Sequence, residues 1–146
     1  MSDLLLAAHA AATWGMTGVI WVVQIVHYPL FGRVGREEFP GYARAHAARV
    51  IPLAAPLMVA EAATAIAILF RTPAGVPPEQ ALAGAGLLAA IWLCTAMVQL
   101  PQHARLRRGY DDAVARALVR WNWVRTILWS VRALLAAAWI VPPGSR

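Results

Sequence analysis

The chain has no lysine, one cysteine and only seven acidic residues among its 146 residues. Charged residues make up 14% of the sequence, against roughly 25% in an ordinary soluble domain. A single cysteine excludes a disulfide framework and a zinc site built from several thiolates. The basic residues are thirteen arginines, which give a net charge of +6. Because these arginines interrupt long apolar runs and form no continuous solvated face, we expect a lipid bilayer as the partner, and no nucleic acid.

Four apolar segments are each long enough to cross a bilayer, which requires about 20 residues. They cover approximately residues 4–31, 42–70, 80–106 and 113–141. The connections between them are short and contain glycine, proline and aspartate, which are typical of turns. Short connections join antiparallel neighbours, so residues 1–146 are predicted to form a single all-α domain, an integral membrane four-helix bundle of up-down topology.

The distribution of arginine predicts the orientation in the membrane. Nine arginines lie in or beside the first and third connections, whereas the opposite ends of the spans carry only Arg71 and Arg146. Positively charged loops remain in the cytoplasm. We therefore expect a multi-pass protein of the bacterial inner membrane with both termini on the non-cytoplasmic side.

Polar side chains inside the spans are the candidate functional residues, since such groups are costly in a bilayer and mark sites by default. Each span carries some of them, and helical spacing places them at a similar depth, in the half expected to face the cytoplasm. The sequence predicts a pocket lined by Gln24, His27, His46, Arg49, Gln99, His103, Asn122 and Arg125.

This pocket is compatible with several chemistries. Its three histidines can hold a metal ion, or two of them can ligate haem b while Arg49 and Arg125 bind the propionates. Without a metal, a histidine can accept a proton from a phenol-like or quinone-like ligand while Arg125 stabilises the oxyanion. The catalytic candidates are His27, His46, His103 and Arg125, and the metal candidates are the same three histidines. The ligand-binding candidates are Gln24, Arg49, Gln99, Asn122 and the ring of Trp129.

Glu61 is an acidic residue in the middle of the second span. We expect a structural ion pair with Arg132 or, alternatively, with Arg125, because pairing offsets the cost of burying both charges. Two non-enzymatic functions remain as alternatives. In the first, Glu61 is the proton-carrying group of a transporter, which would have to form a homo-oligomer to provide a path across the membrane. In the second, the polar faces serve only to hold together the helices of a small membrane subunit or carrier.

Four stretches resemble a group of small bacterial four-span membrane proteins that is similar to the anthrone-oxygenase-like family. They are residues 23–31 (VQIVHYPLF), 46–49 (HAAR), 95–103 (TAMVQLPQH) and 122–129 (NWVRTILW). The family shares a P-x-[NH]-x-x-L element late in the third span and a W-x-x-x-R-like element in the fourth, here residues 101–106 and 121–125. His103 stands where asparagine is common. Some members are implicated in oxidising polyketide anthrones to quinones, so the resemblance implies oxidoreductase chemistry on a hydrophobic aromatic molecule.

A second resemblance is to the four-span membrane protoporphyrinogen oxidase of bacteria, a haem-associated protein. That pattern has a histidine near the start of the first span and a proline in the second, to which His9 and Pro56 correspond. The characteristic lysine of that family has no counterpart in this lysine-free chain. This resemblance implies an association with haem.

Overall fold

The computed structural model describes residues 2–141 as four long helical rods, so Arg146 lies outside the described residues. The first rod comprises α1 (Ser2–Val22), a π-helical turn η1 (Val23–His27), α2 (Tyr28–Leu30) and a 3-10 turn η2 (Phe31–Arg33). The second rod is α3 (Phe39–Phe70). The third comprises α4 (Pro78–Cys94), a π-helical turn η3 (Thr95–Gln99) and α5 (Leu100–Leu106), and the fourth is α6 (Asp112–Ile140).

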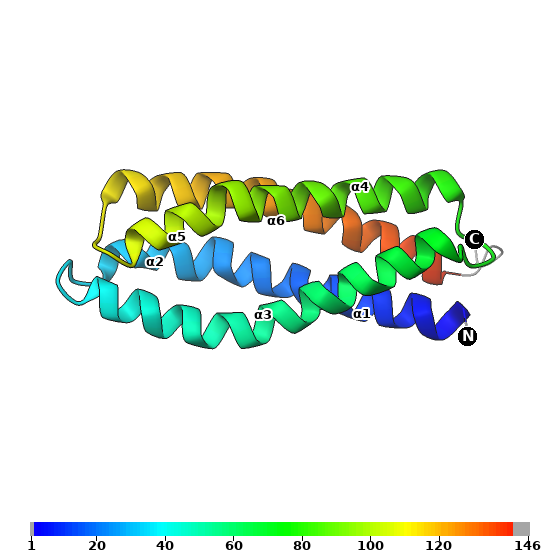
Figure 1. The fold of residues 1–146 in the computed structure, drawn as a ribbon, viewed down its shortest axis with the longest axis horizontal. Helices are drawn as coiled ribbons and strands as arrows, with labels where there is room; N and C mark the ends of the chain where they lie inside the picture. Colours follow the sequence, from blue (N-terminus) through cyan, green and yellow to red (C-terminus); the bar gives the residue numbers. More distant parts are fainter. Residues whose placement is uncertain (1, 142–146) are drawn as a thin grey trace.

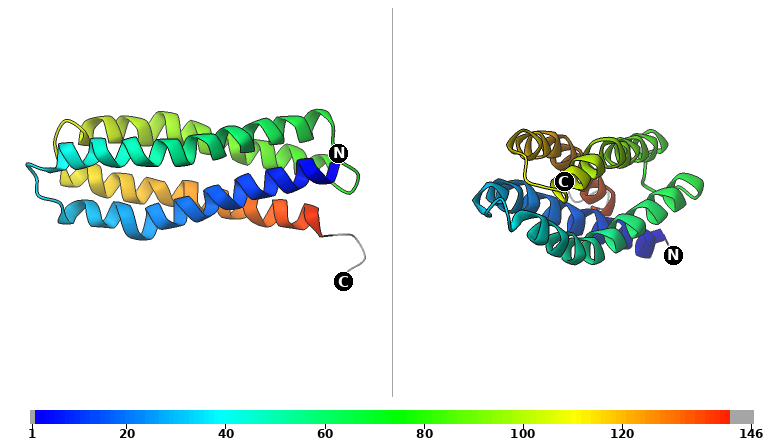
Figure 2. Two further views of the ribbon diagram at one scale, coloured as in Figure 1. Left: turned by 90° about the horizontal axis from the view of Figure 1, so that it is seen from below. Right: turned by 60° about the vertical axis from the view of Figure 1, so that its left-hand side comes forward.

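The rods form an antiparallel bundle (Figure 1). α1 packs against α3 and α6, and α4 packs against the same two helices, so the four rods form a closed ring. The start of α1 and the end of α6 lie at one end of the bundle, and the left view in Figure 2 shows the same arrangement. We call the opposite end, with residues 34–38 and 107–111, the arginine-rich end. The all-helical prediction is confirmed across the described chain, and the spans agree with the expected ranges within a few residues.

The outer surface of the bundle is apolar. Large hydrophobic side chains such as Val59, Leu93, Met97 and Ile127 are exposed, whereas most of the buried polar residues lie between the helices. All four rods are long and apolar enough to cross a membrane. This inverted distribution is typical of a multi-pass membrane protein, in which lipid solvates the outside. Which end faces the cytoplasm stays a prediction.

Prolines and π-helical turns interrupt the helices on the side of the arginine-rich end. Proline has no backbone N–H, so a helix must adjust around it. Ahead of Pro29 and Pro101, the adjustment is a π-helical turn: the N–H of the preceding residue donates to a carbonyl five positions back. α3 contains Pro52 and Pro56, and Figure 1 shows that this helix changes direction part-way along its length.

The apolar core consists of three separate layers along the bundle. Phe31, Phe39 and Leu118 belong to the layer at the arginine-rich end. A middle layer contains Met16, Ile20, Ile91 and Trp129, and a third layer, near the start of α1, contains Leu6, Ile68, Val76 and Ala81. Buried polar residues alternate with these layers along α1 and α6. The bundle therefore contains two polar networks at different depths.

Candidate functional site

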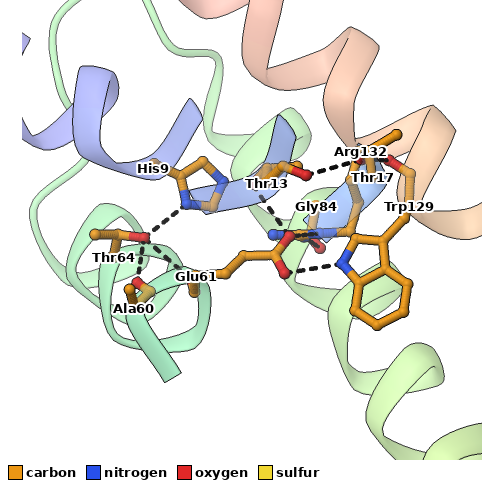
Figure 3. A network of polar contacts seen from close by, with 9 residues as sticks. All are labelled: His9, Thr13, Thr17, Ala60, Glu61, Thr64, Gly84, Trp129 and Arg132. Atoms are coloured by element: carbon orange, nitrogen blue, oxygen red, sulfur yellow. Dashed lines mark hydrogen bonds and ion pairs between the residues drawn. The ribbon is translucent and has the colours of Figure 1, made fainter. Parts of the chain in front are cut away.

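The first polar network surrounds Glu61, whose side chain is fully buried (Figure 3). The carboxylate accepts hydrogen bonds from Arg132 Nε at 2.8 Å, Trp129 Nε1 at 2.9 Å and Thr13 Oγ1 at 3.1 Å. Arg132 also donates to the backbone carbonyl of Gly84. The structure thus contains the expected ion pair between Glu61 and Arg132, and this pair connects α1, α3, α4 and α6.

Further contacts extend this network towards the start of α1. His9 Nδ1 lies 2.8 Å from Thr64 Oγ1, and its ring stacks on Trp139 at a centroid distance of 5.8 Å. Beside Arg132, the packing around His9 and Trp139 leaves no volume for a water molecule. A carboxylate with three donors in a tightly packed region fits a structural lock better than a group that takes up and releases protons.

The second polar network fixes the position of the Arg125 side chain. Asn122 Nδ2 donates to Gln24 Oε1 at 2.9 Å, and Gln24 Nε2 donates to the carbonyl of Val119 at 3.3 Å. Arg125 in turn donates to Asn122 Oδ1 at 3.0 Å, and its guanidinium lies over the ring of Trp129, 5.0 Å from the centroid. Gln24, Asn122 and Trp129, three of the expected ligand-binding residues, therefore position the guanidinium.

The charge of Arg125 has no counter-ion within residues 2–141. The side chain is only 7% exposed, its Nε has no hydrogen-bond partner, and no carboxylate lies within ion-pair distance. Arg132 also has one unbonded nitrogen, but the carboxylate of Glu61 compensates its charge. Because an unpaired buried charge costs several kcal/mol, roughly 3–5 where a partner has been removed, Arg125 is the residue that requires explanation.

A cavity of about 200 Å³ lies in front of Arg125, between α1, α3, the α5 segment and α6. Hydrophobic side chains form most of its wall. Gln99 lines it with both amide atoms lacking a hydrogen-bond partner in the described chain. Tyr28 Oη lies 2.8 Å from His103 Nε2, and both residues line the cavity. The polar lining consists of Tyr28, His46, Thr95, Gln99, His103 and Arg125.

Four of the eight expected pocket residues lie outside this cavity: Gln24 and Asn122, which hold Arg125, and His27 and Arg49. Arg49 is exposed and donates to the carbonyl of Ala45 in its own helix at 3.0 Å. His27 packs edge-on against His46, with ring centroids 5.4 Å apart. Together these three residues line an open groove of about 410 Å³. The expected pocket residues are therefore divided among the cavity, the groove and the network that holds Arg125. Of Arg49, His27 and His46, only His46 lines both the cavity and the groove.

The cofactor hypotheses can be compared with this geometry. In the part of the chain that is described, no group of three or more histidine, cysteine or acidic side chains is arranged to hold a metal ion. His103 pairs with Tyr28 and does not join His27 and His46. Pockets for drug-sized ligands measure roughly 300–1,000 Å³, so a cavity of about 200 Å³ accommodates one ring and is too small for a porphyrin. The cavity in front of Arg125 therefore does not fit haem b.

No family model matches this chain, and no curated protein or solved structure is significantly similar to it. The resemblance to the anthrone-oxygenase-like family therefore stays a prediction, and the argument for function depends on the cavity.

Tyr28 is the important residue that sequence reasoning did not select. Its hydroxyl contacts His103, and its ring is almost completely buried. The available signal was its position four residues after Gln24, on the same helix face. The π-helical turn strengthens this relation, because its larger number of residues per turn moves His27 away from the direction of Gln24 while Tyr28 stays close to it.

Proposed function

We propose that this protein binds the oxygen-bearing ring of a hydrophobic molecule, a phenol or a quinone, in the cavity in front of Arg125. The single observation that carries this proposal is a buried guanidinium without a counter-ion in the wall of the same cavity as Gln99, whose amide has no hydrogen-bond partner. A phenolate or a quinone carbonyl accepts hydrogen bonds from both groups. Binding of such an oxygen offsets the cost of burying them.

The lining of the cavity supports a ring-shaped ligand of this chemistry. Its apolar wall includes Met16, Ile20 and Met58, which suit an aromatic face. Tyr28 and His103, already hydrogen-bonded to each other, are placed to exchange a proton with a hydroxyl of the ring. In this proposal Arg125 and Gln99 hold the oxygen, and the Tyr28–His103 pair changes its protonation.

The route of entry follows from the position of the cavity wall. Ile51 on α3 and Leu100 at the start of α5 both line the cavity, yet they are also 55% and 58% exposed on the lipid-facing surface. A hydrophobic ligand can therefore enter between α3 and α5 from the bilayer, with an attached chain left in lipid. The proposed orientation, with the arginine-rich end in the cytoplasm, places this entry in the cytoplasmic leaflet.

A redox role is the part of the proposal that rests on the family resemblance. A quinone and its quinol differ by two electrons and two protons, so a site that binds both must handle protons on the ring oxygens. A carrier would use the same contacts without turnover. We propose an oxidoreductase that passes the two electrons of a quinol or anthrone-type substrate to an added acceptor, such as dioxygen or a second quinone. Substrate consumption that requires this acceptor distinguishes it from a carrier.

A binding measurement tests the proposal. The purified protein in detergent is titrated by calorimetry with a short-chain benzoquinone and with its quinol. Arg125→Met removes the guanidinium, and we expect the Kd to rise roughly 10- to 100-fold, as for the loss of a hydrogen bond to a charged group. Arg49→Gln is the matched control, because it removes an arginine of the same end that lies outside the cavity.

The outcomes are distinct. Unchanged affinity in Arg125→Met, or an equal loss in Arg49→Gln, would contradict a ligand oxygen at Arg125. Arg125→Lys keeps the charge but loses the two-pronged donor geometry, so an intermediate affinity is expected.

A further inference from the structure

A further groove, which shares only Tyr28 with the lining of the Arg125 cavity, lies at the arginine-rich end. It measures about 520 Å³ and lies between α2 and the first half of α6, with Tyr110 from the connection before α6. Arg116 and Arg120 line it from α6. None of the hydrogen bonds that organise the Glu61 or Arg125 networks involves these two arginines. The groove therefore needs an explanation of its own.

Neither of the two arginines that line the groove forms an ion pair in the described chain. Arg116 and Arg120 are both exposed and stand four residues apart, one turn of α6, where two like charges repel each other. Asp112, one helical turn before Arg116, forms an ion pair with Arg36. An anion between the two guanidinium groups would remove the repulsion.

The rest of the groove is apolar and aromatic. Pro29, Ala115 and Val119 contribute hydrophobic surface, and Trp123 lies one turn beyond Val119 on the same helix. Tyr110 is held in place by Phe39, with ring centroids 4.8 Å apart, and by the guanidinium of Arg36, 5.5 Å from the ring centroid. Tryptophan and tyrosine are enriched where lipid head groups meet the hydrocarbon. A basic rim beside an apolar floor suits an amphipathic anion better than a free one.

We infer that this groove binds one anionic phospholipid, with its phosphodiester between Arg116 and Arg120 and its acyl chains along the apolar surface of α6 towards Trp123. The groove lies at the helix ends, at the level where head groups are found in a bilayer. Basic pockets between transmembrane helices bind lipid head groups in this way. The inference does not depend on the ligand of the Arg125 cavity.

The test compares two double variants that remove the same charge at the same end of the bundle. R116Q/R120Q changes the groove, and R105Q/R108Q is the matched control, because its exposed arginines lie outside the groove. The protein in detergent is titrated with short-chain phosphatidylglycerol or phosphatidylcholine, and bound lipid is counted by native mass spectrometry. Each arginine near a lipid head group contributes roughly fivefold in affinity, so we expect roughly a 25-fold loss in R116Q/R120Q and little change in R105Q/R108Q.

Three outcomes would overturn the inference. They are equal phosphatidylglycerol binding by all variants, an equal loss in both double variants, and equal binding of phosphatidylcholine by the unmodified protein. A further arm adds inorganic phosphate at millimolar concentration. If phosphate displaces the lipid, the site is one for free anions and the assignment to a lipid fails. If the double variant does not fold, R116Q and R120Q are measured singly, each with an expected loss of roughly fivefold.

Discussion

Two buried glutamines offer a direct test of which polar residues hold the bundle together. Gln24 and Gln99 lie in the two π-helical turns and are 2% and 1% exposed. Gln24 takes part in three hydrogen bonds, with Asn122, Thr126 and the carbonyl of Val119. Gln99 has no protein partner for either amide atom. Replacement of each by leucine, which has a similar volume, should therefore have different effects on stability.

The magnitude follows from the number of bonds lost. A hydrogen bond between transmembrane helices contributes on average about 0.6 kcal/mol, so Gln24→Leu should cost about 2 kcal/mol. This corresponds to a fall of roughly 5 °C in Tm. Gln99→Leu loses no hydrogen bond within the protein and adds apolar surface beside the cavity, so its Tm should be unchanged or higher in ligand-free protein.

The only cysteine of the chain provides the assay. Cys94 is half-buried in the third rod, beside η3, and reacts with a thiol-specific fluorogenic dye as the bundle unfolds. Thermal unfolding of the ligand-free protein is followed in this way for both variants, with Asn122→Leu as a second disruption of the Gln24 bonds. An equal fall in Tm for Gln24→Leu and Gln99→Leu would refute the reasoning, since Gln99 would then be a structural residue and not a free donor to a ligand.

Three further predictions concern the charged residues. Arg132→Met should lower the free energy of unfolding by about 3–5 kcal/mol, because it leaves the Glu61 carboxylate buried without its counter-ion. The double variant Glu61→Gln/Arg132→Met should recover part of this loss in the same unfolding assay. Arg125→Met should leave the stability of the ligand-free protein unchanged or raise it, because it removes a buried charge that has no counter-ion and loses only the contacts with Asn122 and Trp129. A loss as large as that of Arg132→Met would show a compensated charge at Arg125. Asp111 caps α6 by accepting from the N–H groups of Ala113 and Val114, and the Val114 hydrogen bond is the main cause that lowers the pKa of this carboxyl below 3.8. The ionised cap therefore stabilises the protein fully above the unfolded pKa, and this stabilisation is lost as pH falls through the lower folded pKa. The difference in Tm between the unmodified protein and Asp111→Ala should be constant from about pH 8 to 5 and shrink below about pH 4. A difference that persists at lower pH would contradict an ionised cap.

The fold could be predicted from the sequence because span length and turn composition determine it almost directly. An apolar run of about 20 residues has one common structure in lipid, and the short glycine- and proline-containing connections allow only antiparallel neighbours. The ion pair of Glu61 with Arg132 was predictable for a similar reason, because a buried acid in the middle of a membrane requires a cation.

The details of the site were harder to predict, because they depend on the direction of each side chain around its helix. At a constant rotation of 100° per residue, His27 and Tyr28 both lie within about 60° of Gln24. The π-helical turn at residues 23–27 turns His27 away from that face, while Tyr28 stays on it and lines the cavity. On α3, the depth of Arg49 matched that of the pocket, but its direction did not, and the side chain lies on the exposed surface. The depth of a side chain along the bundle follows from its position in the sequence, whereas its direction around the helix also depends on irregularities of the backbone.

The position of the Glu61 network has a mechanical consequence for the bundle. This network joins all four rods on one side of the Arg125 cavity, while the π-helical turns and the prolines of α3 lie between it and the arginine-rich end. The four rods are therefore joined by a buried ion pair on one side of the cavity, and on the other side they continue through irregular helical turns to an apolar layer. Helix separation that admits a molecule to the cavity should occur on the side of the irregular turns, while the ion-paired side keeps the same packing.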